Sequence, residues 1–163
     1  DMAEVLRDYV VGCAVAYRPG TAIDGYSGAG QTATALSDKG VRVSAIELDP
    51  DASIWSASKL RAPSVAVQGK VEDVLDGLLP ADLVLLNPPR AGVDARVTSI
   101  LEAHASSLKA VIYVSCNPAT LARDLSRLPS FGIESMRAFD MFPQTAHVET
   151  VCELRPRNAE GGS

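Results

Sequence analysis

The chain has 163 residues, the usual length of one domain with its own hydrophobic core. Its 47% hydrophobic and 21% charged residues exclude collagen-like, coiled-coil and broadly disordered proteins, and no apolar run reaches the roughly 18–20 residues that a membrane span needs. Acidic residues outnumber basic ones by 20 to 15, and the net charge of −5 excludes tight, unaided binding of nucleic acid because most of the surface repels phosphate.

A helix opens the chain, and short apolar runs follow it. Apolar side chains over residues 2–13 recur at helical spacing, namely Met2, Val5, Leu6, Tyr9, Val10 and Cys13, and Pro19-Gly20 ends the pattern. Apolar runs of strand length then occupy residues 22–26, 41–48, 64–68, 82–86 and 110–115. Each is followed by a segment with helical periodicity, at 29–39, 51–61, 71–79, 95–108 and 118–128. Two last strands are expected at 132–139 and 147–155, with no helix between them.

These elements predict an α/β fold built on a doubly wound, Rossmann-like sheet. The first runs are apolar on both faces, which is typical of strands covered on two sides, so the sheet is expected to be mostly parallel. The last two strands are expected to form an antiparallel terminal hairpin. We expect one domain over residues 1–156 and a disordered tail over 157–163. Ligands of such sheets bind at the carboxyl ends of the strands.

A glycine-rich loop follows the first predicted strand. The segment Asp24-Gly25-Tyr26-Ser27-Gly28-Ala29-Gly30 places glycines where the chain turns from strand into helix, and lets the backbone approach a ligand closely. Glu47 ends the second strand near the ~20-residue spacing expected of an acid that binds a ribose diol. The acid that opens the loop can hold an amine or an ordered water. The loop resembles the first motif of class I methyltransferases, whose cofactor is S-adenosylmethionine.

The fourth predicted strand ends in Asn87-Pro88-Pro89-Arg90. Two consecutive prolines cannot continue a strand, and they fix a rigid corner that aims the side chains of Asn87 and Arg90. Asn-Pro-Pro followed by an aromatic residue is typical of methyltransferases that act on exocyclic amines, but Arg90 stands at the aromatic position. An amino-group methyltransferase that uses Asn87-Pro88-Pro89 is therefore one alternative function.

Cys116 follows the fifth predicted strand and precedes a helix. Asn117 suits the N-cap and Pro118 the first turn, so the thiol is expected at a helix N-terminus, where the dipole stabilises a thiolate. Because the carboxyl end of a strand lies in the expected ligand cleft, Cys116 is a candidate nucleophile. Cys13 and Cys152 lie on apolar stripes and are interpreted as packing residues.

The segment between the last two strands carries a candidate base. Several hydrogen-bonding side chains lie between residues 140 and 149, and most are expected to be solvated. Glu149 alternates with Val148 and Thr150 at the start of a strand, where an acid that faces the carboxyl edge of the sheet is partly desolvated. Such a carboxyl group can act as a general base.

Taken in order, these segments resemble the RNA uracil-5-methyltransferases that modify transfer and ribosomal RNA. The segments are 24–30, Asn87-Pro88-Pro89-Arg90-Ala91-Gly92, Ser115-Cys116-Asn117-Pro118, and Asp140-Met141-Phe142-Pro143-Gln144 through His147-Val148-Glu149. The similarity spans roughly residues 1–156. It implies an enzyme that transfers a methyl group from S-adenosylmethionine to carbon 5 of a uridine in tRNA or rRNA.

The resemblance also implies a role for each candidate residue. Cys116 matches the nucleophile that adds to carbon 6 of uracil, because carbon 5 alone is too poor a nucleophile. Glu149 matches the base that removes the proton left on carbon 5. The residues expected to bind the cofactor are Asp24, Tyr26, Gly28, Gly30, Gln31, Glu47 and Asn87, with Glu47 on the ribose hydroxyls. Arg90 is assigned to negative charge on the uracil ring or on a phosphate.

Three positions depart from the family pattern, of which Ser27, in place of a common Cys after the Tyr, is a mild change. Asn87 replaces the usual Asp, so an acceptor-only carboxylate becomes an amide that also donates. Lys70 stands where a polar acceptor often meets the adenine amino group, and an ammonium cannot accept a hydrogen bond. A cofactor-binding domain that keeps the fold and catalyses nothing is therefore the other alternative.

The expected partners follow from the resemblance and from composition. Family members carry an N-terminal RNA-binding barrel and a central domain, so we expect an RNA substrate that needs N-terminal parts absent from this chain. The three cysteines are far apart in sequence and form no Cys-x-x-Cys pair, so we expect no disulfide framework and no metal site. We expect a monomer in the reducing cytoplasm with no membrane association.

Overall fold

The computed structural model describes residues 1–142, 144 and 147–158, and the expected elements occur in the expected order. The helices are α1 (Met2–Ala16), α2 (Gln31–Asp38), α3 (Pro50–Lys59), α4 (Val71–Leu78), α5 (Ala95–Ala103) and α6 (Pro118–Ser126), with a short 3-10 helix η1 (Ala105–Ser107). The strands are β1 (Thr21–Gly25), β2 (Arg42–Glu47), β3 (Val65–Gln68), β4 (Leu83–Leu86), β5 (Ala110–Ser115), β6 (Phe131–Asp140) and β7 (Val148–Pro156). Among these residues, no helix is long and apolar enough to cross a membrane.

The strands form one sheet in the order β3-β2-β1-β4-β5-β7-β6. Strands β1 to β5 pair in parallel, whereas β7 runs antiparallel between β5 and β6. The predicted mostly parallel, doubly wound sheet with an antiparallel terminal hairpin is therefore confirmed. The strand order reverses direction between β1 and β4, so the carboxyl ends of these two strands flank the crevice where such sheets bind ligands.

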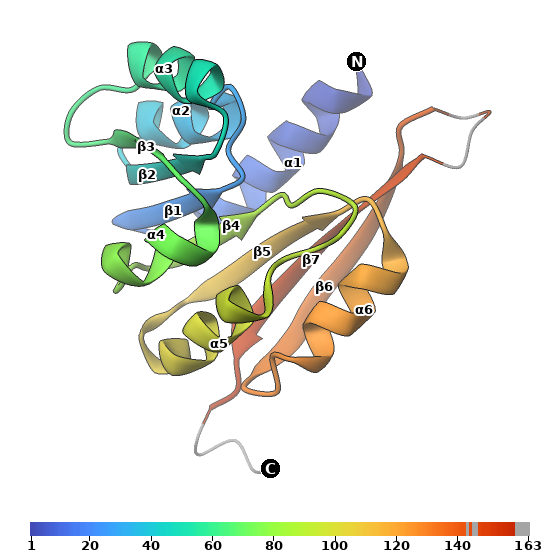
Figure 1. Ribbon diagram of the computed structural model, residues 1–163. Helices are drawn as coiled ribbons and strands as arrows, with labels where there is room; N and C mark the ends of the chain where they lie inside the picture. The colour runs from blue at the N-terminus through green and yellow to red at the C-terminus, as the bar shows by residue number, and fades with distance from the viewer. Residues whose placement is uncertain (143, 145–146, 159–163) are drawn as a thin grey trace.

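Helices cover the sheet on both faces (Figure 1). On one face, Val10 and Ala14 of α1 and Leu36 of α2 are buried in one apolar cluster. On the other, the buried Leu75 of α4 and Leu101 of α5 belong to a second cluster, which also takes in α6. Each fully buried aliphatic side chain contributes roughly 1.5–3 kcal/mol. The two layers fix the sheet and leave its carboxyl edge to the loops.

Two local expectations were wrong. The helix expected over 95–108 ends at Ala103, and a 3-10 turn follows in which the Ser107 hydroxyl donates to the His104 carbonyl. Strand β3 is not covered on both faces, because none of its residues is buried and both Val65 and Gln68 are exposed.

Candidate functional site

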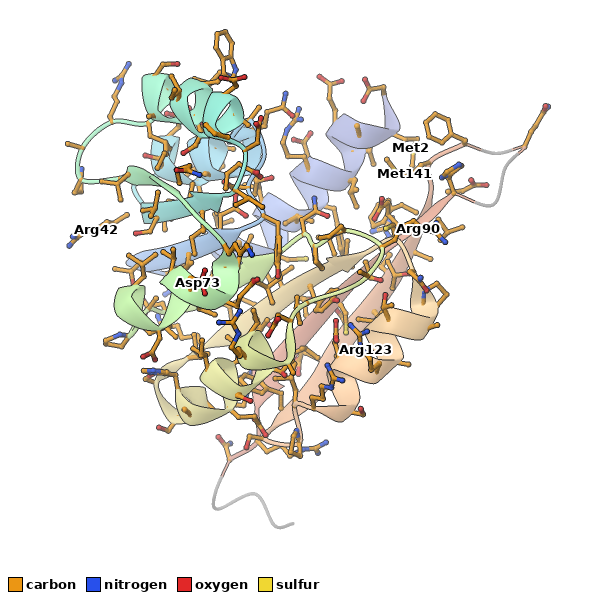
Figure 2. All side chains as sticks on the ribbon, in the orientation of Figure 1. Met2, Arg42, Asp73, Arg90, Arg123 and Met141 are labelled. Carbon is orange, nitrogen blue, oxygen red and sulfur yellow. The ribbon has the colours of Figure 1, made fainter. Side chains whose placement is uncertain are left out.

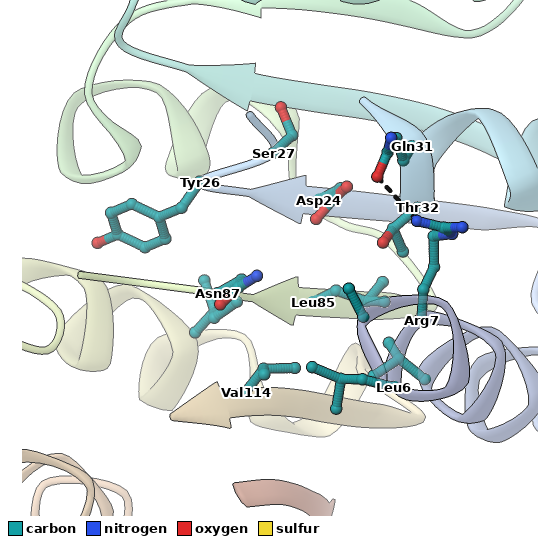
Figure 3. A pocket seen from close by; sticks show the side chains of 13 residues that line it. Leu6, Arg7, Asp24, Tyr26, Ser27, Gln31, Thr32, Leu85, Asn87 and Val114 are labelled. Atoms are coloured by element: carbon teal, nitrogen blue, oxygen red, sulfur yellow. Dashed lines mark hydrogen bonds between the residues drawn. The ribbon is translucent and has the colours of Figure 1, made fainter. Parts of the chain in front are cut away.

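Two pockets that share lining residues open at the carboxyl edge of the sheet. The α1 pocket, of about 200 Å³, lies between α1 and the ends of β1, β4 and β5, and its polar and apolar lining includes Arg7, Asp24, Gln31, Thr32 and Val114 (Figure 3). The β2 pocket, of about 480 Å³, lies at the ends of β2 and β3, and its lining includes Ile46, Glu47, Leu48, Lys70, Val71 and Pro89. Tyr26 and Asn87 line both. The two pockets therefore form one elongated cleft across the point where the strand order reverses.

The glycine loop makes the sharp turn that the sequence predicts. Tyr26, Gly28 and Gly30 all have positive φ, at 61°, 57° and 82°. Gly30 is the N-cap of α2, and a Cβ atom there would clash with Ser56 of α3. The loop therefore needs glycine at this position, and the strained Tyr26 backbone directs the ring between the two pockets.

Glu47 connects this loop to the end of β2. Its carboxylate accepts hydrogen bonds from the backbone N–H groups of Gly28 and Asp49, both at 2.8 Å. The side chain also lines the β2 pocket. A carboxylate has about four lone-pair sites, so these two bonds leave acceptors for further donors such as hydroxyl groups.

Asp24 is a buried carboxyl group at the wall of the α1 pocket. It is 4% exposed, and its Oδ2 atom has no hydrogen-bond partner within the described part of the chain. Burial, and to a lesser extent the negative charge of Glu47, raises the pKa of Asp24 to about 7. An unpaired carboxyl oxygen in a pocket fits a ligand that brings a positive charge.

Gln31, Asn87 and Lys70 lie where the sequence places them, at the rim of the cleft. The side chain of Gln31, at the start of α2, accepts a hydrogen bond of 2.8 Å from Nη1 of Arg7. Asn87 is exposed and follows β4, and Lys70 precedes α4 as its N-cap. All three line a pocket.

Cys116 occupies the turn between β5 and α6. Asn117 caps α6 by accepting from the backbone N–H groups of Ala119 and Thr120, and Pro118 is the first helical residue, as predicted. Cys116 is a free cysteine and is partly exposed. Neither Cys116 nor Glu149 lines the two pockets described above.

The strand register brings Cys116 and Glu149 to neighbouring positions. The last pair of the β5–β7 ladder is Ser115 opposite Thr150, so Cys116 and Glu149 are the next residues along the two strands. Oε2 of Glu149 is buried with no hydrogen-bond partner among the described residues. Burial raises the pKa of Glu149, and the charge of His147 opposes this shift. Residues 143, 145 and 146 of the same motif lie outside the described residues.

The loop after β4 is attached to α6 by a network that the sequence analysis missed. Thr120 donates to the Arg90 carbonyl at 2.9 Å, and Arg123 donates to the Ala91 carbonyl at 2.7 Å. The fully buried Asp124 accepts from the Val93 N–H at 3.0 Å and forms an ion pair with Arg123. The sequence feature that could have pointed to this network is the acid Asp124, which lies at helical spacing from the apolar Leu121 and Leu128.

The structure places two arginines differently from what the sequence suggests: Arg7 lines a pocket, whereas Arg90 does not. Arg90 is exposed and lines neither pocket, so its assignment to the uracil or a phosphate stays a prediction (Figure 2). Arg7 lines the α1 pocket but was overlooked. Its signal was a charge at helical spacing from Ala3 and Val10, which line the same pocket. Within the described residues, no group of three or more His, Cys, Asp or Glu is arranged to hold a metal ion.

Comparisons with known proteins give this cleft a family context. Residues 70–156 match the family model described as tRNA (uracil-5-)-methyltransferase. An uncharacterized RNA methyltransferase of Listeria innocua is 40% identical over 84% of this chain and 32% of its own length, and one of Protochlamydia amoebophila is 42% identical over 82% and 32%. The chain thus spans about a third of the length of these relatives.

Solved structures agree with the sequence matches. The tRNA (uracil-54, C5)-methyltransferase of Pyrococcus abyssi, in complex with S-adenosyl-L-homocysteine, superposes with a TM-score of 0.73 at 30% identity, over 82% of this chain and 33% of that chain. The magnesium protoporphyrin IX methyltransferase of Synechocystis, with a TM-score of 0.69 and 15% identity over 94% of this chain and 79% of that chain, shares the fold alone. The Rossmann-like sheet is therefore of the methyltransferase type.

Proposed function

The chain belongs to the tRNA (uracil-5-)-methyltransferase family, and from that membership we propose that it transfers a methyl group from S-adenosylmethionine to carbon 5 of a uridine in tRNA or rRNA. The proposal covers the chemistry of the described cleft. It includes an RNA partner held largely by N-terminal parts of a longer chain and, because the three cysteines are free, a reducing cytoplasmic setting.

The donors and acceptors of the cleft fit this cofactor. The unpaired Asp24 carboxyl group suits its ammonium, and Glu47 suits the ribose hydroxyls. Ile46, Leu48 and Val71 give the β2 pocket apolar walls for the adenine ring. When bound, S-adenosylmethionine supplies an electrophilic methyl group. Tyr26 and Asn87, which line both pockets, separate the adenosine region from the amino-acid region of the cleft.

Cys116 and Glu149 perform the covalent and proton-transfer steps in this proposal. The Cys116 thiolate forms a C–S bond to carbon 6 of uracil, and the electron pair of the carbon 5–carbon 6 double bond makes carbon 5 nucleophilic. Once carbon 5 carries the methyl group, a Glu149 carboxylate oxygen takes the proton that remains there. The double bond re-forms, the C–S bond breaks, and the thiolate is regenerated.

The register of β5 and β7 is the observation that carries the proposal. Ser115 pairs with Thr150 at the end of the ladder, which supports a catalytic pair made of the residue that follows Ser115 and the residue that precedes Thr150, although the two are far apart in sequence. The proposed base also has the environment that its task requires. A buried oxygen without a partner and a raised pKa suit a carboxylate that must accept a proton near neutral pH.

A covalent trap tests the proposal. RNA that contains 5-fluorouridine cannot lose fluorine as a proton, so the enzyme–RNA adduct persists. The chain and a 5-fluorouridine tRNA transcript are incubated with S-adenosylmethionine, each macromolecule at about 100 µM, which lies at the upper end of the range of non-specific dissociation constants expected for tRNA. Adducts are counted on denaturing gels and located by mass spectrometry. We expect a one-to-one adduct at Cys116. The variant Cys116→Ala should form none, whereas the control Cys13→Ala, on α1, should match the wild type.

The outcomes separate the alternatives. An adduct that survives in Cys116→Ala contradicts the assigned nucleophile. Normal methylation of an exocyclic amine by Cys116→Ala supports the amino-group methyltransferase. S-adenosylhomocysteine binding without any adduct in the wild type supports a cofactor-binding domain that does not catalyse the reaction, to which the Asn87 and Lys70 departures would then point.

A further inference from the structure

The α1 pocket has one cation and one anion among the described residues that line it, namely Arg7 and Asp24. Arg7 projects from α1 on the same side as Leu6 and Val10 and reaches the start of α2. Figure 3 shows its guanidinium beside Gln31 and Thr32, with the Asp24 carboxyl group on the neighbouring strand. The two charges come from different elements and face a common space.

Neither charge forms an ion pair within the described part of the protein, and Glu4, which interacts with Arg7 electrostatically, is exposed. Arg7 makes a hydrogen bond to the uncharged side chain of Gln31 and no ion pair with any described carboxylate. Oδ2 of Asp24, in a residue that is 4% exposed, has no hydrogen-bond partner among the residues that the structure describes. Two opposite charges that line one pocket and do not pair leave room between them for a ligand that carries both.

The start of α2 adds further donors beside Arg7. Gly30 caps α2 without a side-chain hydrogen bond, so backbone N–H groups of the first turn lack a side-chain acceptor. Gln31 and Thr32 of this turn line the pocket. A guanidinium next to a helix N-terminus is suited to a carboxylate, because both present N–H donors and positive charge.

We propose that Arg7 binds the α-carboxylate at the amino-acid end of the cofactor, with Gln31 orienting the guanidinium, while Asp24 takes the ammonium. The proposal rests on the function proposed above and deepens it by naming a residue that selects the zwitterionic end. An α-amino-acid group carries a carboxylate and an ammonium on one carbon, which matches the opposed charges. The cleft should therefore discriminate between nucleosides that share the adenosine and sulfur but differ in this group.

Arg7 contributes little to the fold, so its removal tests binding. It is partly exposed, and α1 is anchored to the sheet by Val10, Val11 and Ala14. Its single hydrogen bond is made to an exposed side chain on the surface. A variant that lacks the charge should keep its fold, which a melting curve verifies.

Calorimetry with three ligands at pH 8 tests the proposal. The ligands are S-adenosylhomocysteine, its decarboxylated analogue S-adenosyl-3-thiopropylamine, and 5′-methylthioadenosine, which lacks the whole amino-acid group. For Arg7→Met we expect roughly 10- to 100-fold weaker binding of S-adenosylhomocysteine, the loss typical of a charged hydrogen bond. Binding of the other two ligands should change by less than about twofold. Arg7→Lys should recover part of the affinity, and the control Arg42→Met, at the far end of β2, should match the wild type.

Three other results would each contradict a different part of the proposal. If Arg7→Met binds S-adenosylhomocysteine as well as the wild type does, the carboxylate assignment is wrong while the proposed cofactor stands. If all three ligands weaken equally, Arg7 supports the cleft structurally and does not read the carboxylate. If the wild type binds none of the three nucleosides, the proposed function fails, and the inference fails with it.

Discussion

Asp24 and Glu149 each hold a buried carboxyl oxygen without a hydrogen-bond partner in the described residues. Leaving such an atom unpaired costs roughly 1–3 kcal/mol, and folded proteins rarely retain it without a use. Both acids lie toward the carboxyl ends of the parallel strands, one at the glycine loop and one beside Cys116. Their environments suit different tasks. Asp24 is suited to bind a cationic ligand, and Glu149 is suited to accept a proton.

The raised pKa of Asp24 predicts how cofactor binding depends on pH. Below its pKa of about 7, the free protein holds a proton on Asp24 that an ammonium ligand must displace. The association constant for S-adenosylhomocysteine should therefore fall by about twofold from pH 8 to 7, where half of Asp24 is protonated, and by up to tenfold per unit as the pH drops further towards 5. Calorimetry in buffers of different ionisation enthalpy measures how many protons are released when the ligand binds, and we expect the proton to come from Asp24.

The variant Asp24→Asn is the control for this prediction. It should bind S-adenosylhomocysteine more weakly at pH 8 and show no pH dependence attributable to this site. Because the native pKa lies above the unfolded value, ionisation of Asp24 lowers the free energy of unfolding as pH rises from about 4 to 7. The variant should lose this slope in urea titrations. A wild-type affinity that is constant from pH 5 to 8 would contradict the assignment of Asp24.

At the scale of elements, α6 holds the loop between β4 and α5. Asp124 of α6 accepts from the Tyr113 hydroxyl at 2.5 Å and from the Val93 N–H at 3.0 Å, and it pairs with Arg123. The helix that follows Cys116 is thereby joined to the loop that follows Asn87. Two segments of the proposed site are therefore fixed to each other by buried polar contacts.

Removing the Asp124 carboxylate should destabilise the protein by about 3–5 kcal/mol, because its buried partners lose their acceptor together. The variant to measure is Asp124→Ala, in urea denaturation. Tyr113→Phe is the matched control, since it deletes one hydrogen bond of the same network and should cost about 1 kcal/mol. If the two variants cost the same, the carboxylate does not organise this loop.

The elements themselves were predictable because their signals are local. Apolar runs such as 110–115 give strands, and Asn117-Pro118 specifies the start of α6 through capping. The Asp124 network was not predictable, since nothing in the sequence tells that this acid of α6 meets the backbone of Val93. Arg7 was missed for the same reason, because its partner Gln31 lies on another helix.

At the scale of the whole molecule, the sheet topology explains why residues far apart in the sequence line one cleft. A parallel sheet collects the ends of all its strands at one edge, so Asp24, Glu47 and Asn87 could be assigned to one cleft before the structure was known. The position of Glu149 depends on the register of β7 against β5, and a shift of one residue would turn it to the opposite face of the sheet. The resemblance supplied the roles of Cys116 and Glu149, but the pairing of β7 with β5 was contained neither in it nor in the periodicity.

The net charge of −5 predicts that this chain binds the cofactor product far better than it binds RNA. Affinity for RNA depends on neutralised phosphates, and an acidic surface offers few cations for them. We expect dissociation constants for tRNA weaker than ~10 µM near 0.15 M salt, the range of non-specific binding, with a shallow dependence on salt. Fluorescence anisotropy across a salt series measures both quantities, with S-adenosylhomocysteine titrated in parallel. Submicromolar binding with a steep salt dependence would mean that the described surface itself gathers enough basic residues to hold the RNA.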